Sequence, residues 1–385
     1  METPVFHPVG TPVLDLDTPA LVVDLDVMDA NMAELKRLLG RSTAGIRPDV
    51  ASHGCPTIGH RQLAAGSPEG AGTQFNGIRV NTVGEAEVFA GAGFNDILIA
   101  NPLVTRTKMA RLCALARTTK ISVAVDDANN AAALSATARE SEVTLGVLIA
   151  VDAGSGLFGV APGAKALSLA GEVARSPGLY LWGLTASLGW SNSPRVTSEG
   201  SQTSGPGQTA NDSTNRLQEV VETSRQIQAE GIDSPVVSLA GVVDYQQVAN
   251  TPEVTEIQAQ SFGLADYNQC LHQPGFSPAP KILAGVISHP TEGSAVLDAG
   301  HKSTGPDLGL PVLEGIDGAQ ATRFSAEHGI LQLEDGAAGQ LKPGDKVWLV
   351  PFDLEMCANQ YDYIRAVRNG KLEGFWPIAA RGRFS

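Results

Sequence analysis

Two carboxylates near the end of the chain, Asp353 and Glu355, are separated by one residue. In an extended segment, residues i and i+2 point to the same face, so both carboxylates could converge on one metal ion. Carboxylate oxygens suit hard ions, and the sequence therefore predicts Mg²⁺, Mn²⁺ or Ca²⁺ rather than Zn²⁺. On spacing alone, a solvated acidic edge strand is the simpler interpretation.

Histidines are few in this chain, and two in the C-terminal third are candidates for chemistry. His328, in a Glu-His-Gly sequence, is a candidate third metal ligand or proton shuttle, because imidazole titrates near neutral pH. His301, which is followed by the cation Lys302, is a further catalytic candidate. A surface or structural role is assigned to His7, His60, His272 and His289.

Composition limits the classes of protein that this chain can represent. With 385 residues, of which 43% are hydrophobic and 18% charged, it can bury a substantial core. The net charge of -14 argues against nucleic-acid and anionic-membrane partners, since phosphate contacts need clusters of Lys and Arg. Scattered cysteines and the lack of a signal-like N-terminus or long apolar run predict a cytoplasmic protein acting on a small molecule.

Short apolar runs alternate with amphipathic stretches over residues 21–272, which predicts a (β/α)8 TIM-like barrel. A doubly wound open sheet is the alternative. Predicted strands are Leu21–Leu25, Ile78–Thr82, Asp96–Ala100, Ile121–Val125, Thr144–Val151, Tyr180–Thr185 and Pro235–Ala240. Predicted helices are Asp29–Leu39, Val83–Ala92, Thr105–Ala116, Asn129–Glu140, Pro162–Arg175 and Thr214–Glu230.

The pattern of residue types changes after the predicted barrel. Short strand-like runs are separated there by Gly and Pro turns, without long helical patterns. This pattern predicts a C-terminal antiparallel β domain over residues 273–385 that carries the candidate metal site. We expect the N-terminal segment, residues 1–20, to pack with that β domain.

The stretch 191–213 is rich in Ser, Gly, Thr, Pro and Asn and nearly free of apolar residues. It follows a predicted barrel strand, and on a barrel it would lie at the active-site face. Two interpretations remain open, a tolerated flexible insertion and a lid over the pocket.

Segment 47–53 reads Arg-Pro-Asp-Val-Ala-Ser-His and resembles the cofactor-anchoring motif of the D-threonine aldolase/D-serine dehydratase family. That family belongs to the alanine-racemase-like class of pyridoxal phosphate (PLP) enzymes and typically has Arg-Pro-His-x-Lys-x-His there. The resemblance implies a lysine that forms a Schiff base with PLP. This chain has Ala51 at the lysine position and Asp49 at the first histidine. Because a methyl group cannot form an imine, we expect no PLP.

The resemblance covers nearly the whole chain, and other PLP-handling positions are altered too. The family's Gly-rich phosphate turn is Leu-Ala-Gly-Val-Val-Asp at 239–244, where Asp244 adds a negative charge near a would-be phosphate. At the family's Tyr and His positions this chain has Ser187 and Trp190, and at a position where the family often has Arg it has Leu157. The resemblance therefore implies a retained scaffold with changed cofactor chemistry.

The resemblance also places Asp353 and Glu355 at the family's two metal-ligand positions, in the stretch Pro-Phe-Asp-Leu-Glu-Met-Cys-Ala-Asn-Gln-Tyr-Asp at 351–362. This favours the metal interpretation of the pair. His53 lies at the family's second motif histidine, next to the lost lysine. His53 or Asp49 is then the predicted general base.

These features predict a PLP-independent, divalent-metal-dependent lyase for a small β-hydroxy carbonyl compound or β-hydroxy acid, by retro-aldol cleavage or dehydration. A substrate with its own ketone provides an electron sink without PLP. Two alternatives remain open: a catalytically inactive, small-molecule-binding pseudoenzyme and a metal-dependent hydrolase or isomerase. The family resemblance implies a homodimer.

Overall fold

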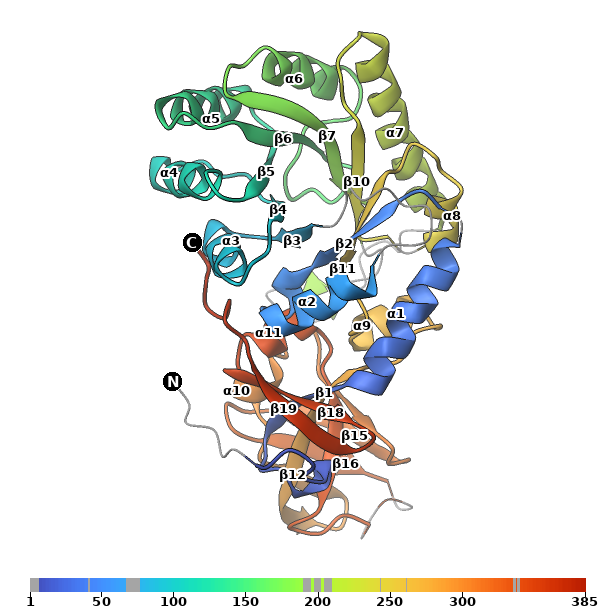
Figure 1. Cartoon of the computed structure of the whole chain (residues 1–385). Coiled ribbons are helices and arrows are strands. Elements are labelled where there is room, and N and C mark those ends of the chain that lie inside the picture. The colour runs from blue at the N-terminus through green and yellow to red at the C-terminus, as the bar shows by residue number, and fades with distance from the viewer. Residues whose placement is uncertain are drawn as a thin grey trace.

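The computed structural model describes residues 7–40, 42–66, 77–189, 195–196, 202–203, 210–242, 244–260, 262–334, 337 and 340–385. It forms a closed parallel barrel and, below it in Figure 1, a β domain built around a nine-stranded sheet. The short helix α11 (Leu354–Ala358) lies where the two meet. No helix within the described ranges has the length and apolarity that a bilayer crossing needs.

Eight parallel strands close the barrel, and helices surround it, as the sequence predicts. In barrel order the strands are β2 (Gly45–Asp49), β3 (Ile78–Val80), β4 (Asp96–Ile99), β5 (Lys120–Val125), β6 (Leu145–Val151), β7 (Leu179–Ser187), β10 (Val236–Ala240) and β11 (Glu256–Gln260). The helices are α1 (Leu25–Leu39), α2 (Pro56–Ala65), α3 (Val83–Gly91), α4 (Arg106–Leu115), α5 (Ala128–Glu140), α6 (Ala164–Ala174), α7 (Ala210–Ala229), α8 (Tyr245–Ala249) and α9 (Tyr267–His272).

The prediction that residues 21–25 form a barrel strand is wrong. Strand β1 (Ala20–Asp24) pairs antiparallel with β12 and parallel with β18, so it lies inside the sheet of the β domain. Strands β2 and β11, which the periodicity did not single out, complete the barrel. An apolar run indicates that a strand is buried, but it does not indicate which neighbouring strands that strand pairs with.

Helix α1 shows how local sequence sets an element that links the two sheets. Asp24 caps its N-terminus by accepting from the backbone N–H groups of Asp26 and Val27, and Gly40 ends it with φ +55°. Its apolar face, Met28, Met32, Leu35 and Leu39, recurs at helical spacing and is buried.

The β domain contains β1 and eight strands from the second half of the chain. They are β12 (Pro280–Thr291), β13 (Ser294–Leu297), β14 (Val312–Glu314), β15 (Ala319–Phe324), β16 (Gly329–Leu333), β17 (Lys346–Val350), β18 (Tyr363–Arg368) and β19 (Lys371–Pro377). Short helices are α10 (His301–Thr304), α11, η1 (Val13–Asp15) and, at the end of β2, η2 (Val50–Ser52). Residues before β1 contact this domain, since the N–H groups of Gly10 and Val13 donate to Leu372 and Gly370.

Most of the stretch predicted as a lid or flexible insertion, 191–213, lies outside the described residues. Within it, the two-residue strands β8 (Arg195–Val196) and β9 (Gln202–Thr203) pair with each other, and α7 begins at Ala210.

Candidate functional site at the barrel mouth

The carboxyl ends of β2 and β3 meet α11 of the β domain at the mouth of the barrel. Helix α11 contacts η2, which follows β2 directly, so residues 49–53 and 353–355 come from distant parts of the chain to one place. In parallel barrels this end carries the loops that bind and react. The positions that sequence analysis singled out around 49–53 therefore lie where a barrel enzyme works.

Asp49 is the last residue of β2 and is nearly buried. One carboxylate oxygen accepts a hydrogen bond from the N–H of Ala51 at 3.2 Å and thereby caps η2. The other forms an ion pair with Nη1 of Arg79 at 2.5 Å. Asp49 is thus positioned by the backbone N–H of Ala51 and by one cation, the guanidinium of Arg79.

His53, the predicted base or pocket residue, is buried and held at both ring nitrogens. Its Nδ1 accepts from the N–H of Cys55 at 3.1 Å, so Nε2 carries the proton and lies 3.2 Å from Oε1 of Gln62. Burial lowers the pKa of His53 to about 4. His53 is therefore a neutral, oriented side chain at neutral pH.

The expectation that Asp353 and Glu355 share the face of an extended segment is wrong. Asp353 is the N-cap of α11 and accepts from the N–H of Met356 at 2.9 Å, while Glu355 lies within the helix. Glu355 accepts from Nδ2 of Asn81 at 3.1 Å. A capping carboxylate followed by Leu-Glu-Met-Cys-Ala begins a helix, and this competes with strand formation.

The two carboxylates nevertheless interact. Burial, followed by the negative charge of Asp49, raises the pKa of Glu355 to about 7, and Asp353 adds to that effect. Arg79 opposes it. Burial also raises the pKa of Asp353. An excess of negative charge therefore lies between α11 and the ends of β2 and β3.

The structure does not bring His328 or His301 to this place. His328 is exposed in the turn between β15 and β16, where its N–H donates to Oγ of Ser325 at 3.0 Å. His301 begins α10, and its Nε2 lies 3.0 Å from the carbonyl of Phe324. Among the described residues there is no group of three or more His, Cys, Asp and Glu able to hold a metal. The described residues therefore form no three-member group of Asp353, Glu355 and His328, and their role as metal ligands stays a prediction.

Two cavities open at the mouth. The first, of about 180 Å³, we call the tail cavity, because the C-terminal residues 378–384 line one side of it. On its other side it is lined by Ala51, His53, Asn81, Glu85 and Glu355. The second, of about 60 Å³, we call the barrel cavity, because strand ends inside the barrel line it together with Arg79. No lysine among the described residues lines either cavity.

The turn after β10 is the position that the resemblance assigns to the family's phosphate turn. Asp244 caps the short helix α8 by accepting from the N–H of Gln247 at 2.9 Å. Gly241 has φ +64°, and a Cβ there would lie 2.9 Å from the backbone N of Gly189. A carboxylate thus occupies the helix N-terminus that would otherwise attract a phosphate.

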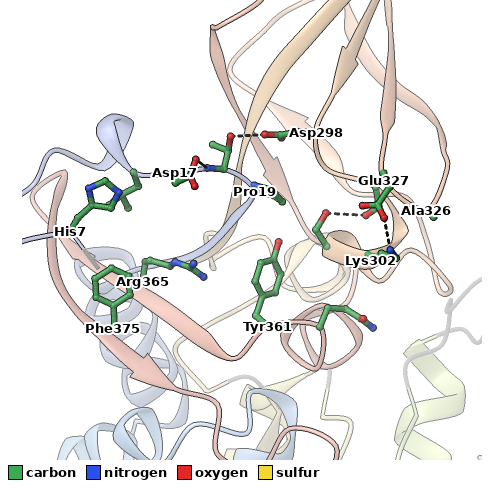
Figure 2. Close-up of a pocket in the computed structure, with 15 residues that line it drawn as sticks. His7, Asp17, Pro19, Asp298, Lys302, Ala326, Glu327, Tyr361, Arg365 and Phe375 are labelled. Atoms are coloured by element: carbon green, nitrogen blue, oxygen red, sulfur yellow. Dashed lines mark hydrogen bonds and ion pairs between the residues drawn. The ribbon is translucent and has the colours of Figure 1, made fainter. Parts of the chain in front are cut away.

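A larger cavity, of about 390 Å³, lies elsewhere, between the N-terminal segment and the β domain. Figure 2 shows Asp17, Asp298, Lys302, Glu327, Tyr361 and Arg365 around it, with Thr18 bonded to Asp298. None of the predicted site residues lines this cavity. Size alone therefore does not locate the candidate site, and the barrel mouth holds the residues of interest.

Sequence reasoning missed Arg79, Asn81 and Glu85, which complete the mouth. Glu85 accepts from the N–H groups of Asn81 and Thr82, at 2.7 and 3.0 Å, and so fixes the start of α3. A signal was present for Arg79, because a charged residue between Ile78 and Val80 in a buried strand needs a partner or a function.

A closed (β/α) barrel followed by an antiparallel β domain, with the site between them, defines an alanine-racemase-like protein. The family profile described as "Alanine racemase, N-terminal domain" matches residues 23–245, and that described as "Putative serine dehydratase domain" matches residues 279–367.

Similar proteins identify the family within this class more specifically. The D-threonine aldolase of Arthrobacter sp is 33% identical, with 97% of this chain and 95% of that protein covered. The 3-hydroxy-D-aspartate aldolase of Paracoccus denitrificans is 30% identical, over 96% and 93%. The crystal structure of D-threonine aldolase from Filomicrobium marinum superposes with a TM-score of 0.86 at 31% identity, covering 98% of this chain and all of that one. The chain therefore belongs to the D-threonine aldolase family.

Proposed function

We propose that this protein is a lyase that acts without PLP and uses a divalent metal to cleave or dehydrate a small β-hydroxy carbonyl compound or β-hydroxy acid. The observation that carries the proposal is the juxtaposition of Asp353 and Glu355 with Asp49 at a barrel mouth whose cavities no described lysine lines. Relatives named as aldolases support lyase chemistry.

The mouth does not fit a covalently bound PLP. Ala51, at the position that the resemblance assigns to the lysine, carries no amine. Asp49 and Arg79 form an ion pair beside it, and the carboxylate of Asp244 caps the helix after the family's phosphate turn. An imine could not form here, because there is no lysine amine at position 51. A buried phosphate would meet the carboxylate of Asp244 where it needs free backbone N–H groups.

Two features of the mouth support a hard divalent cation there. Asp353 and Glu355 provide two carboxylates, and unbalanced negative charge around Glu355 is what a cation would relieve. Mg²⁺ and Mn²⁺ commonly use one or two carboxylates and fill their other positions with water or substrate oxygens. Bound there, the ion would supply Lewis-acid polarisation of a substrate carbonyl.

The protein's own residues would divide the remaining work. Asn81 orients Glu355 through its hydrogen bond, and Arg79 holds the carboxylate of Asp49 in an ion pair. Asp49 is preferred to His53 as the candidate base, because its carboxylate oxygens keep lone pairs beyond those used by Ala51 and Arg79, whereas burial lowers the pKa of His53 to about 4. In a retro-aldol step the β-hydroxyl loses its proton to Asp49, the bond between Cα and Cβ breaks, and the electron pair passes into the enolate of the carbonyl fragment.

Elemental mass spectrometry of the purified protein tests the metal directly. We expect near-stoichiometric Mg or Mn in the wild type. In Glu355→Gln the affinity for the metal should fall at least about tenfold, because a neutral amide is a much weaker ligand than a carboxylate. Asp353→Asn should also weaken binding while leaving α11 intact, since Asn caps helices as well as Asp does.

Glu327→Gln is the matched control, because that exposed carboxylate pairs with Lys302 away from the mouth. Equal metal content in all variants would show that the metal binds at another place in the protein. If no metal binds even after reconstitution, the pseudoenzyme alternative takes precedence. Turnover of β-hydroxy ketones and acids, screened with the metal-loaded protein, separates a lyase from a hydrolase or isomerase.

A further inference from the structure

Of the described residues that line the barrel cavity, one has a charged side chain, and it is Arg79. The others are small, apolar or neutral: Ala100, Ala150, Val151, Ser155, Leu157, Phe158, Thr185, Ala186, Ser187, Ala240 and Gln258. Among the described residues, no carboxylate lines this cavity. A cation that faces hydroxyl and amide groups in a partly apolar pocket is an environment for a small anion.

Arg79 is held in place by carboxylates that are not among the described residues lining this cavity. Its Nη1 bonds to Asp49, and Glu355 and Glu85 lie near enough to favour its charged form. Only 15% of its side chain is exposed. Its buried Nε has no hydrogen-bond partner among the described residues. The guanidinium is thus a fixed cation with donor capacity to spare, and a buried unsatisfied donor is costly.

The dimensions of the cavity favour one type of anion. At about 60 Å³ it has room for a head group of a few atoms. A planar carboxylate matches the guanidinium fork with two parallel hydrogen bonds, whereas a phosphate dianion beside a single cation would be poorly balanced. Leu157 and Phe158, which are 82% and 38% exposed in the loop after β6, add apolar surface at the opening.

We propose that Arg79 binds a carboxylate of the substrate, so that the substrate is a small carboxylic acid that also carries the β-hydroxy carbonyl group of the proposed reaction, rather than a neutral β-hydroxy ketone. This inference rests on the proposed function for the reaction, but anion binding at Arg79 requires neither metal nor turnover. From Arg79, the carbon chain of the ligand would extend toward Asp49 and Glu355, the two carboxylates that interact with that arginine. Arg79 is then a substrate-binding residue that sets specificity.

Isothermal titration calorimetry of the metal-free protein with 3-hydroxybutyrate, its methyl ester and 4-hydroxy-2-butanone tests this. The wild type should bind the acid at least about tenfold more tightly than either neutral probe. Arg79→Met should abolish that preference, and Arg79→Lys should weaken it because an ammonium lacks the fork. Asp49→Asn should strengthen acid binding, because the competing internal carboxylate is gone.

The opposite signs expected for changes at 79 and 49 separate binding from folding, since both changes break the same ion pair. Arg111→Met is the matched control: it breaks the Arg111–Glu87 pair on the barrel exterior and should leave the preference unchanged. Equal binding of acid and ester by the wild type, no measurable acid binding at millimolar concentrations, or a preference that survives Arg79→Met would each overturn the inference.

The result of this titration can be distinguished from a failure of the proposed function. An Arg79-dependent acid preference in a protein that binds no metal would uphold the anion site and reject the metal-dependent lyase. Metal-dependent turnover with the same KM for the acid in wild type and Arg79→Lys would uphold the lyase and reject the anion site.

Discussion

At the scale of single residues, burial determines what each titratable group at the mouth can do. His53 and Glu355 both line the tail cavity, yet burial keeps the first neutral and moves the pKa of the second up to about 7. Arg79 stays charged because carboxylates surround it. The charge at each position thus depends on neighbours that are distant in the sequence.

His53 gives a prediction about pH. Its pKa is about 4 in the folded protein against 6.5 as the ordinary value, so between these values the unfolded chain binds more protons. Stability should therefore fall as pH drops from about 6.5 to about 4, by on the order of 3 kcal/mol from this residue. His53→Asn, whose Oδ1 can accept from Cys55, should flatten that part of the profile in chemical denaturation.

The exposed His60 provides the comparison, because His60→Asn should leave the profile as it is in the wild type. Identical slopes for His53→Asn and wild type between pH 4 and 6.5 would show that His53 is not the residue responsible.

At the scale of elements, the start of α3 connects the site to the end of the chain. Thr82 and Glu85 form a reciprocal capping box, and Oγ of Thr82 also donates to the carbonyl of Arg383. A Cβ at Gly84 would lie 2.5 Å from the carbonyl oxygen of Ser385, so the tail packs closely on this helix. In Figure 1 the C-terminus accordingly lies beside α3.

Thr82→Ala should therefore destabilise the protein by about 1 to 2 kcal/mol and loosen the tail. Hydrogen exchange should accelerate at residues 380–385, as measured by mass spectrometry. Thr105→Ala is the control, since Thr105 caps α4 with a single bond to Lys108 and touches no tail residue in the described hydrogen-bond network. Equal effects of the two substitutions on tail exchange would contradict the proposed connection.

At the scale of the whole molecule, the chain interleaves its two parts. Strand β1 enters the middle of the β-domain sheet before the barrel begins, and the other strands of that sheet follow only after residue 280. The barrel is thus inserted between pieces of the β domain. The β-domain sheet is therefore complete only after the chain has passed through the whole barrel. The homodimer stays a prediction from the family resemblance.

This interleaving predicts that barrel and β domain unfold together. Variants that keep a single tryptophan, either Trp182 in the barrel or Trp348 in the β domain, should report the same urea midpoint by fluorescence. Two separate midpoints would mean that the parts unfold independently despite the shared β1.

Alternating apolar runs were sufficient to predict the barrel, the antiparallel domain and most helices, because periodicity is a local property of the chain. The motif at 47–53 likewise pointed to the mouth, and the pair Asp353 and Glu355 to its partner element. Three things depended on the tertiary structure: the placement of β1, the helical cap at Asp353, and the distance of His328 from the carboxylates. Arg79 belongs with them, since its partner Asp49 lies 30 residues away and only barrel closure makes them neighbours. Strand pairing and charge contacts are set by long-range packing, and a residue pattern along the chain carries no information about distances across it.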